Sequence, residues 1–261
     1  MIYRKIKPKD FFIYIIVLIV SVIILISSIL NIYMLKDKIS DRLKGFTEDG
    51  RSLVRSSYSV DPTKVELAND IVKNGGYILY FRHGHREKWI DVAMYDAMEA
   101  IGKLDANSHY FRDAVCLSTM GKIQVRMMGE VIKKINMPVG NIITSPSCRA
   151  RQTSQALFGE IGTIDNLFLH PGPYNENLNE FKKSVKSRIL NLEVLEGTNS
   201  IISAHNGVIK AQVFDEIKKN IKYNLEEGGF YVIKKINSKL VLIDKFHNFN
   251  DFSQILFKRP K

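Results

Sequence analysis

Three short apolar segments, each followed by a turn that carries arginine or histidine, constrain the fold of this chain most strongly. The segments and the basic residues after them are 77–81 before Arg82 and His83, 141–144 before Arg149, and 200–204 before His205. Apolar runs of this length are typical of strands buried in an α/β sheet. Because ligands of open α/β sheets bind beyond the carboxyl ends of the strands, we expect these side chains to meet at one edge of the sheet.

Helical patterns alternate with the apolar segments along the rest of the sequence. Helices are expected at 65–73, 120–135, 147–158, 178–192 and 208–219. In the second of these, Ile123, Met127, Val131 and Ile135 are expected to form the buried face. Two further strands, 230–233 and 240–243, are predicted to form a hairpin through Asn237 and Ser238. This alternation predicts a three-layer α/β/α domain with a mostly parallel sheet.

The N-terminal part of the chain differs from the rest. Residues 11–35 contain no charged side chain and are long enough to cross a hydrocarbon core of about 30 Å, so we interpret them as a transmembrane helix. A cleaved signal peptide is the alternative, but its apolar region would be shorter and would end at a small-residue cleavage site. The predicted organisation is a basic tail at 1–10, the membrane span at 11–35, a juxtamembrane stalk at 36–62 and a catalytic domain at 63–261.

Charge and cysteine content limit the partners and the compartment. Basic residues on both sides of the predicted span give a weak bias, and a catalytic domain on the extracytoplasmic side is our prediction. Cys116 and Cys148 are compatible with either side, paired outside the cytoplasm or free inside it. The net charge of +11 suits attraction to a membrane surface, and no basic stripe with interleaved aromatics indicates nucleic-acid binding.

The chemistry of the clustered residues points to a phosphoryl group. Arginine presents a planar fork that matches phosphate oxygens, and a neutral imidazole can attack phosphorus to form a covalent intermediate. Arg82 and His83 are adjacent, and Arg149 is expected near a helix N-terminus, where backbone N–H groups favour an anion. His205 would add another hydrogen-bond donor if protonated.

Four motifs occur in the order found in the histidine phosphatase superfamily, also called the phosphoglycerate mutase-like fold. Arg82-His83-Gly84 is similar to its nucleophile motif, residues 117–124 resemble L-[ST]-x-x-G-x-x-Q, residues 145–153 resemble S-P-x-x-R-A-x-Q-T, and His205 stands at the second histidine. The resemblance covers roughly residues 75 to 245. It implies that His83 is the phosphorylated nucleophile, and that Arg82, Arg149 and His205 form the phosphate pocket. His85-Arg86 extends the first motif as in the acid phosphatase branch, which implies that Arg86 also contacts phosphate.

The proton donor is the part of the pattern that this sequence does not match. The acid phosphatase branch places an aspartate after its second histidine, whereas this chain has Asn206, which cannot act as an acid. The mutase branch places a glutamate between the second and third motifs, so Glu176 is the first candidate. The alternatives are Glu180, Asp91 and Asp96.

We therefore expect a single-pass membrane phosphatase that hydrolyses a phosphomonoester or a phosphohistidine through a phosphohistidine intermediate on His83. Neither a metal nor another cofactor is implied. Its substrate would be a phosphorylated small molecule, a phosphorylated protein or a component of the cell envelope. The alternatives are a phosphomutase of the same fold and a non-catalytic binding module tethered to the membrane.

Overall fold

The computed structural model describes residues 21–22, 61–88, 92–100, 102–104, 106, 110–171, 177–218, 221 and 224–257. Of the predicted membrane span, only Ser21 and Val22 belong to this set, and both are helical. Within the described residues, no helix combines the length and the apolar character needed to cross a bilayer. The predicted tail and nearly all of the predicted stalk lie outside the described residues.

A seven-stranded mixed sheet forms the centre of the domain, with the strand order β3-β2-β4-β1-β6-β7-β5. Four of its pairings are parallel, and the two that involve β6 are antiparallel, so the prediction of a mostly parallel sheet is confirmed. The strands are β1 (Ile78–Arg82), β2 (Val139–Thr144), β3 (Thr163–Ile164), β4 (Asn199–Ala204), β5 (Glu216–Ile217), β6 (Phe230–Ile236) and β7 (Lys239–Phe246).

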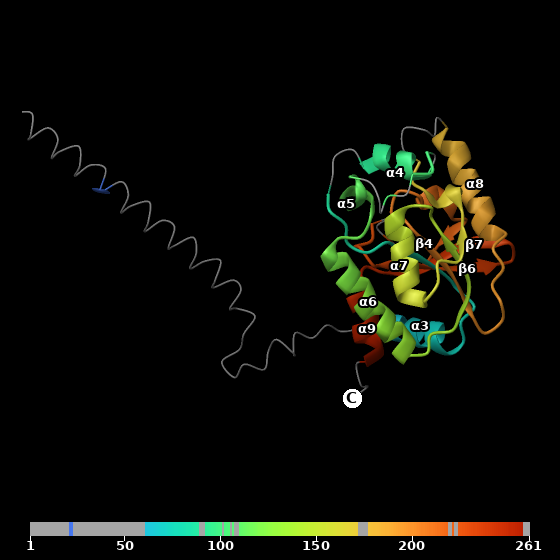
Figure 1. The fold of residues 1–261 in the computed structure, drawn as a ribbon. Coiled ribbons are helices and arrows are strands. Elements are labelled where there is room, and N and C mark those ends of the chain that lie inside the picture. The colour runs from blue at the N-terminus through green and yellow to red at the C-terminus, as the bar shows by residue number, and fades with distance from the viewer. Residues whose placement is uncertain are drawn as a thin grey trace, which may run out of the picture. The chain divides into compact units, whose positions relative to one another are not determined.

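Helices α3 to α9 and the short 3-10 helices η2 and η3 lie around the sheet (Figure 1). The α-helices are α3 (Pro62–Lys73), α4 (Val92–Ala100), α5 (Arg112–Val115), α6 (Thr119–Lys134), α7 (Cys148–Phe158), α8 (Leu178–Leu190) and α9 (Phe249–Phe257). The 3-10 helices are η2 (Asn166–Phe168) and η3 (Ala211–Val213).

Alternating side chains along the strands divide the core into two layers, as the period of two in a strand requires. On one face of the sheet, Tyr80 and Ile202 pack with residues of α8 such as Val185. On the other face, Leu79 and Ile201 pack with residues of α3, α6, α7 and α9. The expected three-layer arrangement is therefore present, with helices on both faces.

The structure contains the predicted hairpin but lacks one of the predicted helices. β6 and β7 pair as expected, and Asn237 and Ser238 both adopt positive φ angles, 49° and 61°, as a tight turn between strands requires. The prediction of a helix at 208–219 is wrong, because the described part of this segment, 208–218, holds only η3 and β5. Its buried residues fall at consecutive positions, and the Asp215 backbone N–H donates to the Leu240 carbonyl beside β7 (2.9 Å) instead of continuing a helix.

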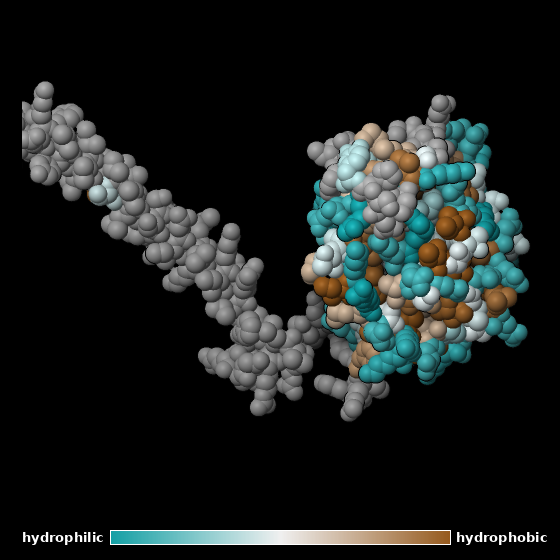
Figure 2. Space-filling view, in the orientation of Figure 1, coloured by the Kyte–Doolittle hydropathy of each residue, from teal (hydrophilic) through white to brown (hydrophobic). Residues whose placement is uncertain are grey.

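Helix α6 forms where the sequence predicts it, but it buries a different face. Val125, Met128 and Ile132 are buried, whereas Ile123 and Met127 are 48% and 66% exposed. Residues spaced by four drift by about 40° per step around a helix of 3.6 residues per turn, so the predicted series cannot stay on one face. Figure 2 shows a largely hydrophilic surface with separate hydrophobic patches on the visible face of the domain.

Candidate active site

The loop after β1 carries His83 and is packed against two helices. The Gly84 N–H donates to Thr153 Oγ1 (3.0 Å), and Thr153 Oγ1 donates to the Arg149 carbonyl oxygen (2.7 Å). A Cβ atom on Gly84 would lie only 2.5 Å from Val125 Cγ1 on α6, so the loop needs glycine at this point. These contacts join the end of β1 to the beginning of α7.

Side chains of the other motifs hold the neighbouring loops. Gln124 Oε1 accepts from the His85 N–H (3.0 Å), while its Nε2 donates to the Glu227 carbonyl (2.8 Å). Gln152 Oε1 accepts from the Leu117 N–H (2.8 Å). Because these amides satisfy backbone groups of separate loops, they position the site without belonging to its reactive centre.

His83 is oriented to present an unprotonated ring nitrogen. Its Nδ1 lies 2.7 Å from the Gly84 carbonyl oxygen, which can only accept, so Nδ1 carries the hydrogen and Nε2 carries the lone pair. Burial, followed by the positive charges of Arg149, Arg82 and Arg86, holds the pKa of His83 well below its usual value. The imidazole is therefore neutral and nucleophilic at neutral pH.

His205, at the carboxyl end of β4, lies beside His83, with 5.2 Å between the ring centroids. Its Nδ1 is 3.2 Å from Arg149 Nη2, and its Nε2 is 2.9 Å from Ser145 Oγ and 3.2 Å from Ser147 Oγ. Since the guanidinium can only donate, Nδ1 accepts and Nε2–H donates to a serine hydroxyl. Burial and the nearby Arg149 hold the pKa of His205 well below its usual value, so His205 is neutral in this arrangement and the protonated form considered from the sequence is not the one present.

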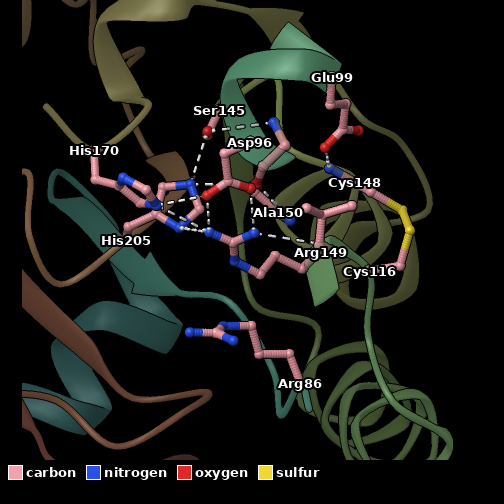
Figure 3. A network of polar contacts seen from close by, with 12 residues as sticks. Arg86, Asp96, Glu99, Cys116, Ser145, Cys148, Arg149, Ala150, His170 and His205 are labelled. Atoms are coloured by element: carbon pink, nitrogen blue, oxygen red, sulfur yellow. Dashed lines mark hydrogen bonds and ion pairs between the residues drawn. A yellow bond between two sulfur atoms is a disulfide. The ribbon is translucent and has the colours of Figure 1, made fainter. Parts of the chain in front are cut away.

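Arg149 is fully buried in the first turn of α7 and is fixed by Asp96 of α4. The pair is bidentate, with Nη1–Oδ1 at 2.6 Å and Nη2–Oδ2 at 2.8 Å. Figure 3 shows the guanidinium fork facing Asp96, with Arg86 on the other side of Arg149. Among the described residues, no hydrogen-bond acceptor contacts the buried Arg149 Nε. A phosphate oxygen is suited to accept from this N–H group.

Arg82 and Arg86 contribute positive charge to the site, although their hydrogen bonds in this structure go to protein atoms. Arg82 donates to the Leu225 carbonyl oxygen (2.6 Å) and to Glu227 Oε1 (3.2 Å). Arg86 donates to the Glu87 carbonyl oxygen (2.6 Å). Both guanidinium groups act electrostatically on His83, so the structure brings all four predicted cationic or imidazole groups and Arg86 together.

The predicted acids are distributed differently. Glu176 and Asp91 lie outside the described residues, and Glu180 is exposed in the first turn of α8. Burial alone would raise the pKa of Asp96, but the charge and hydrogen bonds of Arg149, together with His170, outweigh it and hold that pKa far below the usual range. Asp96 is therefore a permanent anion in this arrangement and is poorly suited to donate a proton.

Sequence reasoning did not identify several other groups near the site. His170 Nε2 lies 2.6 Å from Asp96 Oδ2, and Cys116 forms a disulfide with Cys148. The buried Glu99 carboxylate accepts from the Cys148 backbone N–H (2.9 Å), as Figure 3 shows, and also accepts from Arg151 (2.6 Å). Asp96, Glu99 and Cys116 belong to segment 87–117, which has little hydrophobic periodicity, so sequence patterns do not predict where their side chains lie. Across the described residues, no three His, Cys, Asp or Glu side chains gather as a metal site would require.

Comparisons with known proteins give a limited likeness. No family model and no curated protein matches the sequence. The solved structure of the protein histidine phosphatase SixA complexed with tungstate is 13% identical, with a TM-score of 0.43, over 65% of this chain and 96% of that chain. A mutant phosphoserine phosphatase from Entamoeba histolytica in complex with phosphoserine is 14% identical, with a TM-score of 0.43, over 69% and 99%. At these identities and scores, neither likeness establishes the family or the activity of this chain.

Proposed function

We propose that this protein is a membrane-anchored phosphatase that hydrolyses a phosphomonoester or a phosphohistidine through a phosphohistidine intermediate on His83. One observation carries the proposal: a buried, neutral imidazole with a lone pair on Nε2 lies beside His205 and is subject to the charges of three arginines. An anion entering this group would meet Arg149, whose buried Nε–H has no acceptor among the described residues. The positive charges around the bound anion would stabilise the negative charge on the equatorial oxygens of the phosphoryl group during its transfer.

The reaction proceeds in two displacements. His83 Nε2 forms a bond to phosphorus as the bond to the leaving oxygen breaks, and the leaving oxygen takes up a proton. Water then forms a new phosphorus–oxygen bond as the bond to Nε2 breaks, which releases inorganic phosphate. Splitting the reaction in this way uses the same pocket for both transition states.

The test uses the full-length chain in detergent with an aryl phosphate as substrate. The native protein is expected to release phosphate and to form a phosphoenzyme that is stable in base and labile in acid. His83→Ala should lose both signals, whereas His247→Ala, at a partly buried histidine paired with Glu226, should keep them. Equal phosphate release by native protein and His83→Ala would leave the binding-module alternative, and isomerisation of the substrate without phosphate release would identify a mutase.

We also propose that the phosphatase domain lies on the extracytoplasmic side of the membrane. The disulfide between Cys116 and Cys148 supports this, because disulfides persist mainly in oxidising compartments. The uncharged stretch at 11–35 supports the anchor. A C-terminal fusion to a reporter that is active only outside the cytoplasm should be active, and activity of a reporter restricted to the cytoplasm would refute this orientation.

A further inference from the structure

A groove between α6 and α7 is separate from the phosphate pocket. The two helices lie side by side (Figure 1), and the groove beside their contact has a volume of about 440 Å³. Clefts that hold small ligands usually have volumes of about 300–1,000 Å³. The volume of the groove therefore suits a small organic molecule.

Apolar side chains from several segments line this groove. They belong to the residue before the α6 cap, to α6, to α7 and to the segment before β3: Leu117, Val125, Ala156 and Ile161. The first two are buried and the last two are half-buried, so apolar surface remains open toward the groove. A ligand with an aliphatic or aromatic body would remove that surface from water, which favours its binding.

Three basic side chains line the same groove, namely Lys122 and Arg126 from α6 and Arg151 from α7. Lys122 and Arg126 are four residues apart, so they lie on one face of their helix. The described lining contains no carboxylate, and no described carboxylate forms an ion pair with Lys122 or Arg126. The groove is therefore positively charged, and charge complementarity favours an anion.

Arg151 provides an oriented guanidinium in this lining. Its Nη2 donates to Glu99 Oε1 (2.6 Å), and the other oxygen of that carboxylate accepts from the Cys148 backbone N–H (2.9 Å). The buried Nε–H of Arg151 has no acceptor among the described residues, although the side chain as a whole is 29% exposed. A buried donor without an acceptor costs free energy, and an anionic oxygen beside this guanidinium would offset that cost.

Two of the apolar side chains stand between the groove and the active-site loop. A Cβ atom on Gly84 would lie 3.3 Å from Leu117 Cδ2 and 2.5 Å from Val125 Cγ1, so both side chains pack against the loop that carries His83. Neither His83 nor His205 lines the groove. A molecule in the groove would thus contact the support of the loop without entering the phosphate pocket.

We propose that the groove between α6 and α7 binds a small, freely soluble amphiphilic anion. Its apolar body would lie against the apolar side chains of the groove, and its carboxylate, sulfonate or phosphate group would interact with Arg151, Lys122 and Arg126. The site differs from the phosphate pocket, so the inference goes beyond the function proposed above and does not depend on it.

The experiment uses 4-benzoylbenzoate as the probe with the full-length protein in detergent. Under ultraviolet light its benzophenone group forms covalent bonds to nearby C–H groups, and mass spectrometry of peptides then locates the labelled residues. We expect label within 117–126 and 148–161. Benzophenone has the same photoreactive group but no charge, and it should label these segments about 5-fold less or weaker still.

A pair of double variants tests the role of the basic side chains. Lys122→Gln, Arg126→Gln should lower labelling of the groove by about 5-fold or more, because it removes two of the three positive charges. The matched control is Lys133→Gln, Lys134→Gln, which removes two exposed charges from the same helix outside the groove. The control should stay within about 2-fold of the native labelling. None of the four side chains is buried, so both variants should fold.

Three outcomes would overturn the proposal. Absence of label from 117–126 and 148–161 would show that the groove is not a binding site, and label confined to 82–88 would place the probe in the phosphate pocket. Equal labelling of the two double variants, or by the two probes, would show that the groove does not select anions. Failure of the proposed function is a separate result, recognised by p-nitrophenyl phosphate hydrolysis that His83→Ala does not affect.

Discussion

The Arg149 guanidinium and the Asp96 carboxylate form a bidentate pair in which both side chains are fully buried, with nitrogen–oxygen distances of 2.6 and 2.8 Å. Asp96 belongs to α4, in the segment that follows the His83 loop, and Arg149 belongs to the beginning of α7. The pair fixes the guanidinium before any substrate arrives. The arginine therefore loses little conformational freedom when an anion binds, which favours a preorganised site.

Removal of the Asp96 carboxylate should destabilise the fold strongly. In Asp96→Ala, the Arg149 charge would remain buried without its partner, and breaking such pairs costs about 3–5 kcal/mol. We expect the free energy of unfolding to fall by that amount, as measured by urea denaturation of the full-length protein in detergent. Glu180→Ala, an exposed change, should stay within about 0.5 kcal/mol of the native value. A loss of less than about 1 kcal/mol for Asp96→Ala would show that the pair is not maintained in solution.

The two buried histidines predict how stability depends on pH. The pKa values of His83 and His205 are both held well below the usual histidine value of 6.5, first by burial and then by Arg149. Below that value the unfolded chain binds protons that the folded protein does not, so stability decreases as the pH falls. Each histidine contributes a slope of up to about 1.4 kcal/mol per pH unit until its folded pKa is reached. The free energy of unfolding between pH 8 and pH 5 should decline less steeply in His205→Asn, and an unchanged slope would contradict a low pKa for His205.

The Asn206 amide has a structural role that an acid cannot fulfil. It donates to the Leu225 carbonyl, which also accepts from Arg82, and it accepts from the Leu225 N–H. Asn206→Asp would place a carboxylate oxygen against that carbonyl oxygen, so we expect a loss of about 1–3 kcal/mol in the free energy of unfolding. We also expect no gain in glycerol phosphate hydrolysis. A gain would assign the proton-donor role to position 206.

The sequence predicted those parts of the site whose position follows from regular strands. His83 and His205 both follow buried parallel strands, so the sheet brings them together regardless of their separation along the chain. The contact between Asp96 and His170 was not predicted, because Asp96 lies in the short helix α4, which the sequence analysis did not predict, and His170 lies in an irregular segment where no periodicity fixes the direction of a side chain. The disulfide is a similar case, since two cysteines define a possible pair but not the distance between them.

The buried face of α6 shows a second limit of sequence patterns. Gly121 and Gly129 lie on that face, where added Cβ atoms would approach the His85 and Ala156 carbonyl oxygens to 2.0 Å and 2.1 Å. The large apolar residues indicated a different buried face. Glycine permits close contact between backbones but adds nothing to a hydrophobic pattern, so the pattern did not reveal the face that carries Gly121 and Gly129. The close approach of α6 to its neighbours therefore determines which face of the helix is buried, and that face does not include Ile123 and Met127.

This packing predicts contrasting effects of two nearby substitutions. Gly129→Ala should force α6 away from α7, because the new methyl group would collide with the Ala156 carbonyl oxygen. A backbone atom cannot rotate out of the way as a side chain can. Overpacking of this kind costs about 1–3 kcal/mol. Met127→Ala, on the exposed face of the same helix, should change the free energy of unfolding by less than about 0.5 kcal/mol. Similar values for the two variants in urea denaturation would be inconsistent with the close approach of these helices.

The disulfide predicts a link between oxidation state and the phosphate pocket. Cys148 directly precedes Arg149, and Val115, next to Cys116, accepts a hydrogen bond from Arg149 Nη1 (3.2 Å) through its carbonyl oxygen. The bridge therefore joins the two backbone segments that hold this arginine, and it closes a loop with a sequence separation of 32 residues. The double variant Cys116→Ala, Cys148→Ala should lose about 2–4 kcal/mol in the free energy of unfolding, because its unfolded chain gains freedom.

Phosphatase activity provides a second test of the disulfide between Cys116 and Cys148. We expect KM for p-nitrophenyl phosphate to rise in the double variant, since Arg149 is less firmly placed, while kcat changes less because the His83 loop does not contain either cysteine. A reductant should produce the same rise in KM in the native protein and none in the double variant, which separates loss of the bridge from loss of the two side chains. If the reductant changes KM equally in both proteins, its effect lies elsewhere in the molecule and the bridge does not support the pocket.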